Sequence, residues 1–233
     1  MTALTHVLFD FFGTLVAYSA SWTEQGFQRS HALLLARGAE LDYDEFLERW
    51  DGLFADFEDR AQRSLEEYSM NTVCTEFLRR VLPGDPDAET VAALRDTYLG
   101  EWNKGVRYLP GVQEMLAALA ERFVLVLVTN THHAEVVHTH LRAMNVARHF
   151  ADVITSVEHG RRKPSACIFE RALAQSGGSR DVAAYVGDSF VADYGGATSA
   201  GLRCLLIDPK RRRDLPERDR LNDILEVSAR LTG

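Results

Sequence analysis

The sequence predicts an α/β fold in which a parallel β-sheet core carries an inserted α-helical domain. Short runs of apolar residues alternate with helical patterns over most of the chain, which is typical of a parallel sheet covered on both faces. One long stretch, from about Ser21 to Trp102, contains helical patterns alone. Several apolar runs end in a polar or acidic residue, and the carboxyl ends of parallel strands are where such sheets bind ligands.

Five apolar runs are predicted to form the strands of the sheet. The first, His6–Phe9, is β-prone and ends at Asp10, and a tight turn at Gly13 and Thr14 follows it. The other four come much later: Phe123–Thr129, Asp152–Thr155, Val182–Gly187 and Arg203–Asp208. The helical patterns that alternate with them or follow them are Val112–Ala120, Ala134–Asn145, Ala166–Gln175, Val191–Ala200 and Arg220–Leu231.

The inserted stretch is predicted to form four helices. Their ranges are Trp22–Arg37, Tyr43–Asp59, Leu65–Leu82 and Ala88–Trp102. Asp42 and Asp87 occupy N-cap positions, and Gly38 stands where a helix should end. These patterns divide the chain into a core of residues 1–16 and 106–233 and a four-helix domain of residues 17–105.

Composition and charge favour a protein that acts on small molecules. Hydrophobic residues make up 46% of the 233 residues and charged residues 26%, as in ordinary globular proteins. The net charge of −8 argues against nucleic acid and against an anionic membrane surface as partners. The cysteines are scattered, and neither a long apolar run nor a signal-peptide pattern is present. We therefore expect a cytoplasmic protein that is a monomer or a homodimer.

Polar residues at the predicted strand ends should meet in one pocket, because the carboxyl ends of parallel strands share one edge of the sheet. They are Asp10, Thr129, Asn130, Asp188 and Asp193, with Lys163 at the start of a helix. Three carboxylates repel one another unless a cation lies between them, and Mg²⁺ prefers oxygen ligands. A lysine and a threonine beside them can bind an anionic group. The set indicates phosphoryl transfer, in which a carboxylate can serve as the nucleophile.

Four short motifs resemble those of the haloacid dehalogenase (HAD) superfamily of hydrolases, in the family's order and spacing. They are Asp10-Phe11-Phe12-Gly13-Thr14-Leu15-Val16, Thr129-Asn130, Lys163-Pro164 and Gly187-Asp188-Ser189-Phe190-Val191-Ala192-Asp193. The resemblance extends over the whole chain, and the insertion after the first motif is similar to the family's four-helix cap. It implies a Rossmann-like core, Mg²⁺ as cofactor and a small phosphorylated metabolite as substrate.

The resemblance also implies roles for the motif residues. Asp10 would be the nucleophile that forms an aspartyl-phosphate. Thr129 and Asn130 would hold the phosphoryl oxygens, and Lys163 would stabilise the charge on the nucleophile and the phosphate. The Mg²⁺ ligands would be Asp10, the backbone carbonyl of Phe12, Asp188 and Asp193. The residues that contact the substrate would be Phe11, Phe12 and Asn130.

One position departs from the pattern of the family's phosphatases, which usually carry a second aspartate two residues after the nucleophile. Phe12 stands there instead, and its ring can neither protonate a leaving group nor activate water. General acid–base catalysis is worth about 10²–10⁴-fold, so the substitution matters for the reaction.

Two alternatives follow from Phe12. The haloacid dehalogenases also have an aromatic residue at this position, and halide needs no proton to leave, so a 2-haloacid dehalogenase acting through an aspartyl ester is the first. Those enzymes are metal-free and usually have Ser-Asn in this region of the fourth motif. Asp188 and Asp193 therefore favour phosphoryl chemistry. The second alternative is a catalytically weak binding or regulatory protein that keeps the pocket.

Overall fold

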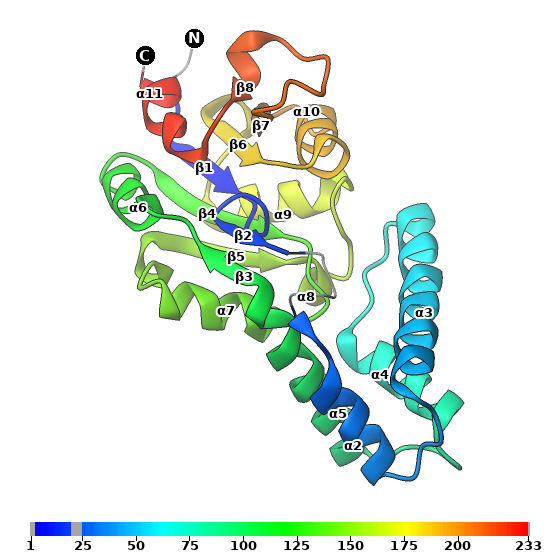
Figure 1. Ribbon diagram of the computed structural model, residues 1–233. Helices are drawn as coiled ribbons and strands as arrows, with labels where there is room; N and C mark the ends of the chain where they lie inside the picture. The colour runs from blue at the N-terminus through cyan, green and yellow to red at the C-terminus, as the bar shows by residue number, and fades with distance from the viewer. Residues whose placement is uncertain (1–2, 20–24, 233) are drawn as a thin grey trace. The chain divides into compact units, whose positions relative to one another are not determined.

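The computed structural model describes residues 3–19 and 25–232, and Figure 1 shows the course of the chain. The chain forms two compact units. One comprises residues 1–17 and 107–233, and the other comprises residues 18–106. None of the helices in the described residues is long and apolar enough to cross a membrane.

A six-stranded sheet with the order β5-β4-β1-β6-β7-β8 forms the centre of the first unit (Figure 1). The neighbouring strands pair in parallel. Their bounds are β1 His6–Phe9, β4 Val124–Thr129, β5 Phe150–Thr155, β6 Ala183–Gly187, β7 Arg203–Ile207 and β8 Arg220–Leu221. In β1, His6 stands opposite Val124 of β4 on one side and Ala183 of β6 on the other. All four β1 residues are buried, as expected for a central parallel strand.

Helices alternate with the strands of this sheet and complete an α/β, Rossmann-like fold, so the predicted fold class is confirmed. The α-helices are α6 Val112–Ala120, α7 Ala134–Ala143, α8 Ser156–His159, α9 Ala166–Ser176, α10 Gly196–Ser199 and α11 Val227–Thr232. Short 3₁₀ turns of this unit are η2 Ala147–His149, η3 Arg180–Val182, η5 Glu217–Asp219 and η6 Ile224–Glu226, whereas η1 Asn103–Gly105 belongs to the second unit. Ile168 and Phe169 of α9 share a buried core cluster with Leu8 of β1 and Val126 of β4.

Two predicted helices of this unit differ from the structure. The segment predicted as helix Val191–Ala200 begins as the π-helix η4, Phe190–Gly195, and only its end is α-helical. The segment predicted as helix Arg220–Leu231 starts with strand β8, because Arg220 and Leu221 are buried beside β7. Helix α11 begins only at Val227, after the 3₁₀ turn η6.

The second unit consists mainly of α2 Gln28–Ala36, α3 Tyr43–Ser64, α4 Met70–Val81 and α5 Ala88–Trp102. Asp42 caps α3 by accepting a hydrogen bond from Glu45 N, at 2.8 Å, as predicted from its position. The predicted helix Leu65–Leu82 is shorter in the structure: α3 runs on to Ser64 and Leu65 adopts left-handed backbone angles. Trp22, the predicted start of the first helix, lies outside the described residues.

The core of the helical unit is aromatic. The ring of Trp50 lies 4.9 Å from that of Phe77 and 4.6 Å from that of Tyr98, and all three side chains are buried. A two-stranded sheet of β2 Val16–Tyr18 and β3 Val106–Tyr108, which the sequence patterns did not predict, lies where the chain passes between the units.

Candidate active site

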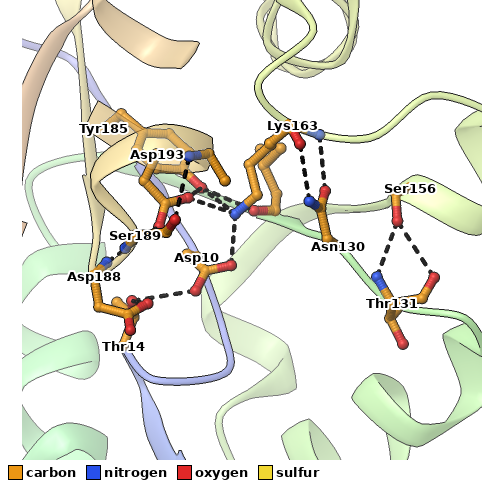
Figure 2. A network of polar contacts seen from close by, with 12 residues as sticks. Asp10, Thr14, Asn130, Thr131, Ser156, Lys163, Tyr185, Asp188, Ser189 and Asp193 are labelled. Atoms are coloured by element: carbon orange, nitrogen blue, oxygen red, sulfur yellow. Dashed lines mark hydrogen bonds and ion pairs between the residues drawn. The ribbon is translucent and has the colours of Figure 1, made fainter. Parts of the chain in front are cut away.

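Asp10 stands directly after the central strand β1, at the carboxyl edge of the sheet. Its backbone N–H donates to Val186 O of β6 at 2.9 Å and continues the pairing of β1 by one residue. Its side chain is buried beside the ammonium of Lys163, whose Nζ donates to Asp10 Oδ1 at 2.6 Å and to Asp193 Oδ1 at 2.7 Å (Figure 2). One lysine from the segment before α9 thus connects a carboxylate at the end of β1 with a carboxylate of the helix that follows β6.

The ammonium of Lys163 has a third acceptor, which the sequence patterns did not single out. Tyr185 of β6 accepts a hydrogen bond from Lys163 Nζ through its hydroxyl, at 2.7 Å. Burial alone would lower the pKa of Lys163, but the charges of Asp10 and Asp193 outweigh it and raise the pKa, so the lysine stays protonated.

The turn after β1 passes close to the carboxylate of Asp188. Gly13 has a φ of 88°, and a Cβ at this position would lie 2.4 Å from Asp188 Oδ2. Only glycine tolerates both the backbone angle and this close approach. The hydroxyl of Thr14 lies 3.2 Å from Asp10 Oδ2 and 3.4 Å from Asp188 Oδ1, where it can donate to either carboxylate (Figure 2).

Asp193 is held on both carboxylate oxygens. Its Oδ2 accepts from the backbone N–H of Asp188 at 3.1 Å and from that of Ser189 at 2.8 Å. Its Oδ1 accepts from Lys163 and lies 2.9 Å from the Tyr185 hydroxyl. These contacts join the first turn of η4 to the residues after β6, and they occupy both oxygens of the carboxylate.

The three carboxylates form a cluster that suits a divalent cation. Asp10, Asp188 and Asp193 each offer an oxygen, and these oxygens lie within 4.8 Å of one another. Asp188 is exposed, unlike Asp10 and Asp193; partial desolvation of its carboxylate and then the charges of Asp10 and Asp193 raise the pKa of Asp188 to about 7. One ammonium therefore does not balance the negative charge at this edge of the sheet. A hard cation with oxygen ligands would balance it, and Mg²⁺ fits this donor set.

Thr129 and Asn130, the predicted phosphoryl-binding pair, differ in their hydrogen-bond partners. Thr129 ends β4 with a buried hydroxyl that has no hydrogen-bond partner among the described residues, so it can serve a ligand. The side-chain amide of Asn130 instead contacts the backbone of Lys163: Oδ1 accepts from Lys163 N at 2.8 Å, and Nδ2 donates to Lys163 O at 3.1 Å (Figure 2). Asn130 thus fixes the segment that carries the lysine.

The two phenylalanines after Asp10 also differ. Phe11 is fully buried, and its backbone carbonyl accepts a hydrogen bond from Leu15 N at 2.9 Å, so it is not exposed to a ligand. Phe12 is half-buried, and its ring lies edge-on to that of Phe11 with the centroids 4.9 Å apart. In the loop after β4, Thr131 is fixed by Ser156, whose Oγ accepts from Thr131 N at 2.9 Å.

The structure therefore brings four of the predicted residues into one cluster: Asp10, Lys163, Asp188 and Asp193. Sequence reasoning missed the bridging position of Thr14 and the contact of Tyr185 with the lysine. The signal for Thr14 is its place in the turn after Asp10. Tyr185 carries a weaker signal, since it is a polar aromatic residue in a strand that is otherwise small and apolar.

Comparison with known proteins gives consistent results. A model of the haloacid dehalogenase-like hydrolase family matches residues 4–201. The chain is 29% identical over 220 residues to a ribulose-1,5-bisphosphate 5-phosphatase of Halopiger xanaduensis, covering 91% of this chain and 88% of the relative. It is 28% identical over 233 residues to a glyceraldehyde 3-phosphate phosphatase of Methanopyrus kandleri, covering 95% of each.

Solved structures of the same fold include two types of enzyme. A 2-haloacid dehalogenase from Pseudomonas syringae superposes with a TM-score of 0.75 at 20% identity, over 98% of both chains. A HAD phosphatase from Thermococcus onnurineus superposes with a TM-score of 0.73 at 23% identity, over 99% of both. At these identities the likeness establishes the fold.

Proposed function

The chain belongs to the haloacid dehalogenase-like hydrolase family, and we propose that it is a Mg²⁺-dependent phosphatase that hydrolyses a small phosphorylated molecule through an aspartyl-phosphate on Asp10. The observation that carries this proposal is the buried ion-pair cluster at the end of β1, in which Lys163 lies 2.6 Å from Asp10 and two more carboxylates lie beside it. Two relatives that match almost the full chain are named as phosphatases, which supports this chemistry.

In the first step, a carboxylate oxygen of Asp10 attacks the phosphorus atom, and the bond from phosphorus to the leaving oxygen breaks. The leaving oxygen takes the electron pair of that bond. The hydroxyl of Thr129 donates a hydrogen bond to a phosphoryl oxygen, since it lacks another partner among the described residues. Lys163 holds Asp10 in place and offsets the negative charge that accumulates at the cluster.

In the second step, water attacks the phosphorus atom of the aspartyl-phosphate, the bond from phosphorus to Asp10 breaks, and phosphate leaves. Asp10, Asp188 and the backbone carbonyl of Phe12 would hold Mg²⁺, with Asp193 acting through a water molecule because its own oxygens accept other hydrogen bonds. When bound, the ion neutralises negative charge shared by the carboxylates and the phosphoryl group.

The helical unit, residues 18–106, is proposed to be the cap that selects the substrate. The partner of the protein is then a small phosphorylated molecule. The net charge of the protein, −8, argues against nucleic acid or an anionic membrane surface as a partner.

The second candidate is a 2-haloacid dehalogenase, and Phe12 is the observation that favours it. In that reaction Asp10 would displace halide from carbon, and water would hydrolyse the resulting ester. The three clustered carboxylates argue against it, because a second and third negative charge beside Asp10 serve no purpose without a cation.

A substrate panel distinguishes these functions. It comprises aryl, acyl and alkyl phosphates and 2-haloacids, each assayed with Mg²⁺ and with EDTA. The phosphatase releases phosphate with Mg²⁺ and is inactive in EDTA. Halide release in EDTA identifies the dehalogenase and contradicts the proposal. Binding of phosphate without turnover of any compound identifies a binding protein and contradicts it as well.

A further inference from the structure

The hydroxyl of Tyr185 lies at the centre of the buried polar cluster, although no part of the reaction proposed above uses it. Within the described residues, Lys163 Nζ donates to three oxygens, on Asp10, Asp193 and Tyr185, at 2.6, 2.7 and 2.7 Å. An ammonium has three N–H groups, so these contacts use all of them. Tyr185 supplies the one neutral acceptor of the three.

The hydroxyl of Tyr185 also has two acceptors for its own hydrogen. Asp193 Oδ1 lies at 2.9 Å and the backbone carbonyl of Val128 at 3.0 Å. Val128 is the residue before Thr129, so the hydroxyl connects the end of β4, the lysine and the carboxylate of η4. Figure 2 shows the side chains of Asp10 and Asp193 joined to Lys163 Nζ by dashed lines.

The ring of Tyr185 is held rigidly. It has no exposed surface, and it packs edge-on against Phe169 of α9 with the ring centroids 5.1 Å apart. Lys163 is also buried, with 3% of its surface exposed, so water does not readily replace a lost acceptor. Removing the hydroxyl would leave a buried N–H of a charged group unsatisfied, which is costly and favours a shift of the ammonium.

We propose that Tyr185 is a positioning residue, which fixes the Lys163 ammonium between Asp10 and Asp193 and thereby keeps the attacking carboxylate in place. Tyr185 acts through Lys163 and does not touch the substrate. This inference rests on the proposed phosphatase function for its kinetic consequence, but the position and mobility of the ammonium can be measured without any substrate.

The variant Tyr185→Phe removes the hydroxyl and keeps the ring. Its matched control is Tyr194→Phe, because the hydroxyl of Tyr194 donates to Asp219 Oδ2 at 3.0 Å, away from the cluster. With 4-nitrophenyl phosphate and saturating Mg²⁺, we expect Tyr185→Phe to lower kcat by about 10- to 100-fold, as for other residues that orient a catalytic group. KM should change by less than about threefold, and Tyr194→Phe should retain wild-type kinetics.

A double-mutant cycle separates positioning from general destabilisation. If Tyr185 acts through Lys163, Tyr185→Phe should have almost no further effect on the residual kcat in a Lys163→Met background. If the role of Tyr185 is purely structural, Tyr185→Phe should lower kcat by the same factor in the wild-type and Lys163→Met backgrounds. That result would overturn the inference. Thermal unfolding of each variant checks that it is folded at the assay temperature.

The lysine content of the chain allows a readout that needs no turnover. Lys104, Lys163 and Lys210 are the only lysines of the sequence, and Lys163 alone among them is buried. In protein labelled with ¹⁵N-lysine, the slowly exchanging ammonium signal is assigned to Lys163 by its loss in Lys163→Met. We expect Tyr185→Phe to accelerate this hydrogen exchange by at least about tenfold, whereas Tyr194→Phe should leave it unchanged.

Turnover and hydrogen exchange together distinguish a failure of the proposed function from a failure of the inference about Tyr185. If the wild type hydrolyses no phosphate ester, the proposed function fails, and the hydrogen exchange still decides whether Tyr185 holds the ammonium. If the wild type is an active phosphatase and Tyr185→Phe matches it in both kcat and exchange, the inference about Tyr185 is wrong and the proposed function stands.

Discussion

At the scale of single residues, we propose that Phe12 decides which substrates the site can use. A phenyl ring stands two residues after Asp10, the proposed nucleophile, and can neither donate nor accept a proton. Substrates whose leaving group is already stable as an anion need no such help. We therefore predict that aryl and acyl phosphates are cleaved much faster than alkyl phosphates of similar size, as measured by kcat/KM over a leaving-group series.

Phe12→Asp tests this explanation. The new carboxyl group should reduce the difference in kcat/KM between aryl and alkyl phosphates, by up to the 10²–10⁴-fold that general acid catalysis supplies. Phe12→Leu, which also removes the ring but adds no carboxyl group, is the control and should leave this difference unchanged. Equal wild-type rates across the series, with chemistry as the slow step, would show that another group supplies the proton.

The residues of the site show what a sequence can reveal at this scale. Asp10, Asp188 and Lys163 were predicted to meet because each stands at a strand end or helix start, and strand order follows from topology rules. The orientation of Asn130 could not be predicted, since an amide can face a ligand or a backbone equally well. The hydroxyl of Tyr185 could not be assigned either, because a tyrosine in a buried strand is usually a packing residue.

At the scale of elements, the turn after β1 depends on the absence of a side chain at Gly13. Gly13→Ala would place a Cβ in a left-handed conformation and 2.4 Å from Asp188 Oδ2, so Asp188 must move. We predict a loss of about 1–3 kcal/mol in the free energy of unfolding and a clear loss of Mg²⁺-dependent turnover.

Gly38→Ala is the matched control for this turn. Gly38 has a φ of 92°, but a Cβ there would meet no atom within 4 Å. Its unfolding free energy should fall through the same backbone strain, while phosphate release should stay at the wild-type level. Unfolding in urea and steady-state kinetics on both variants make the comparison. Equal activity in the two variants would show that the close approach of the new Cβ to Asp188 does not cause the loss of turnover.

The end of β7 carries a pH-dependent element. Burial would raise the pKa of Asp208, but hydrogen bonds from the backbone N–H groups of Arg212 and Arg213 and the charge of Arg220 lower it. A lowered pKa in the folded state means that the stabilisation is present above the ordinary pKa of about 4 and is lost as the pH falls through the lower, folded value.

Asp208→Asn should therefore lower the free energy of unfolding by about 1–3 kcal/mol at pH 7, because the buried guanidinium of Arg220 loses the buried one of its two carboxylate partners and keeps only the exposed Glu217, at 3.5 Å. The difference from the wild type should shrink as the pH drops below about 4, where the wild-type carboxyl is protonated as well. Urea unfolding over a pH series checks this, and a difference that is constant with pH would contradict the ion-pair explanation.

Element boundaries were predicted well where the local sequence marks the ends, as the Asp87 cap does for α5, and poorly where contacts with other elements decide. Strand β1 and helix α5 were predicted with their observed bounds. Strand β8 was predicted as part of a helix, because only its pairing with β7 makes Arg220 and Leu221 extended. The π-helix η4 was likewise invisible to periodicity, since the bonds of the Asp193 carboxylate to Asp188 N and Ser189 N accompany its first turn.

At the scale of the whole molecule, three carboxylates and one ammonium share one edge of the sheet, where Asp10, Asp193 and Lys163 are buried and Asp188 is exposed. A bound Mg²⁺ would relieve the excess negative charge and would stabilise the folded state, which it binds in preference to the unfolded one. We predict that Mg²⁺ raises the Tm of the wild type and that EDTA abolishes turnover.

Asp188→Ala should show a much smaller rise in Tm with Mg²⁺ and should need far more Mg²⁺ for turnover, since it lacks one of the proposed Mg²⁺ ligands. Asp181→Ala, which removes an exposed carboxylate outside the cluster, serves as the control and should behave as the wild type. Full activity of the wild type in excess EDTA would contradict the metal site and favour dehalogenation.

The central claim is that Asp10 carries the phosphoryl group during the reaction, and acid-quenched turnover tests it most directly. Wild-type protein is mixed with a ³²P-labelled aryl phosphate and Mg²⁺, quenched within the first turnover and digested. We predict that the label is on the peptide containing Asp10, that hydroxylamine releases it as expected for an acyl phosphate, and that Asp10→Asn shows neither label nor turnover, with kcat reduced by about 10⁴-fold or more. Steady release of phosphate with no label on that peptide, or with full turnover by Asp10→Asn, would contradict the mechanism.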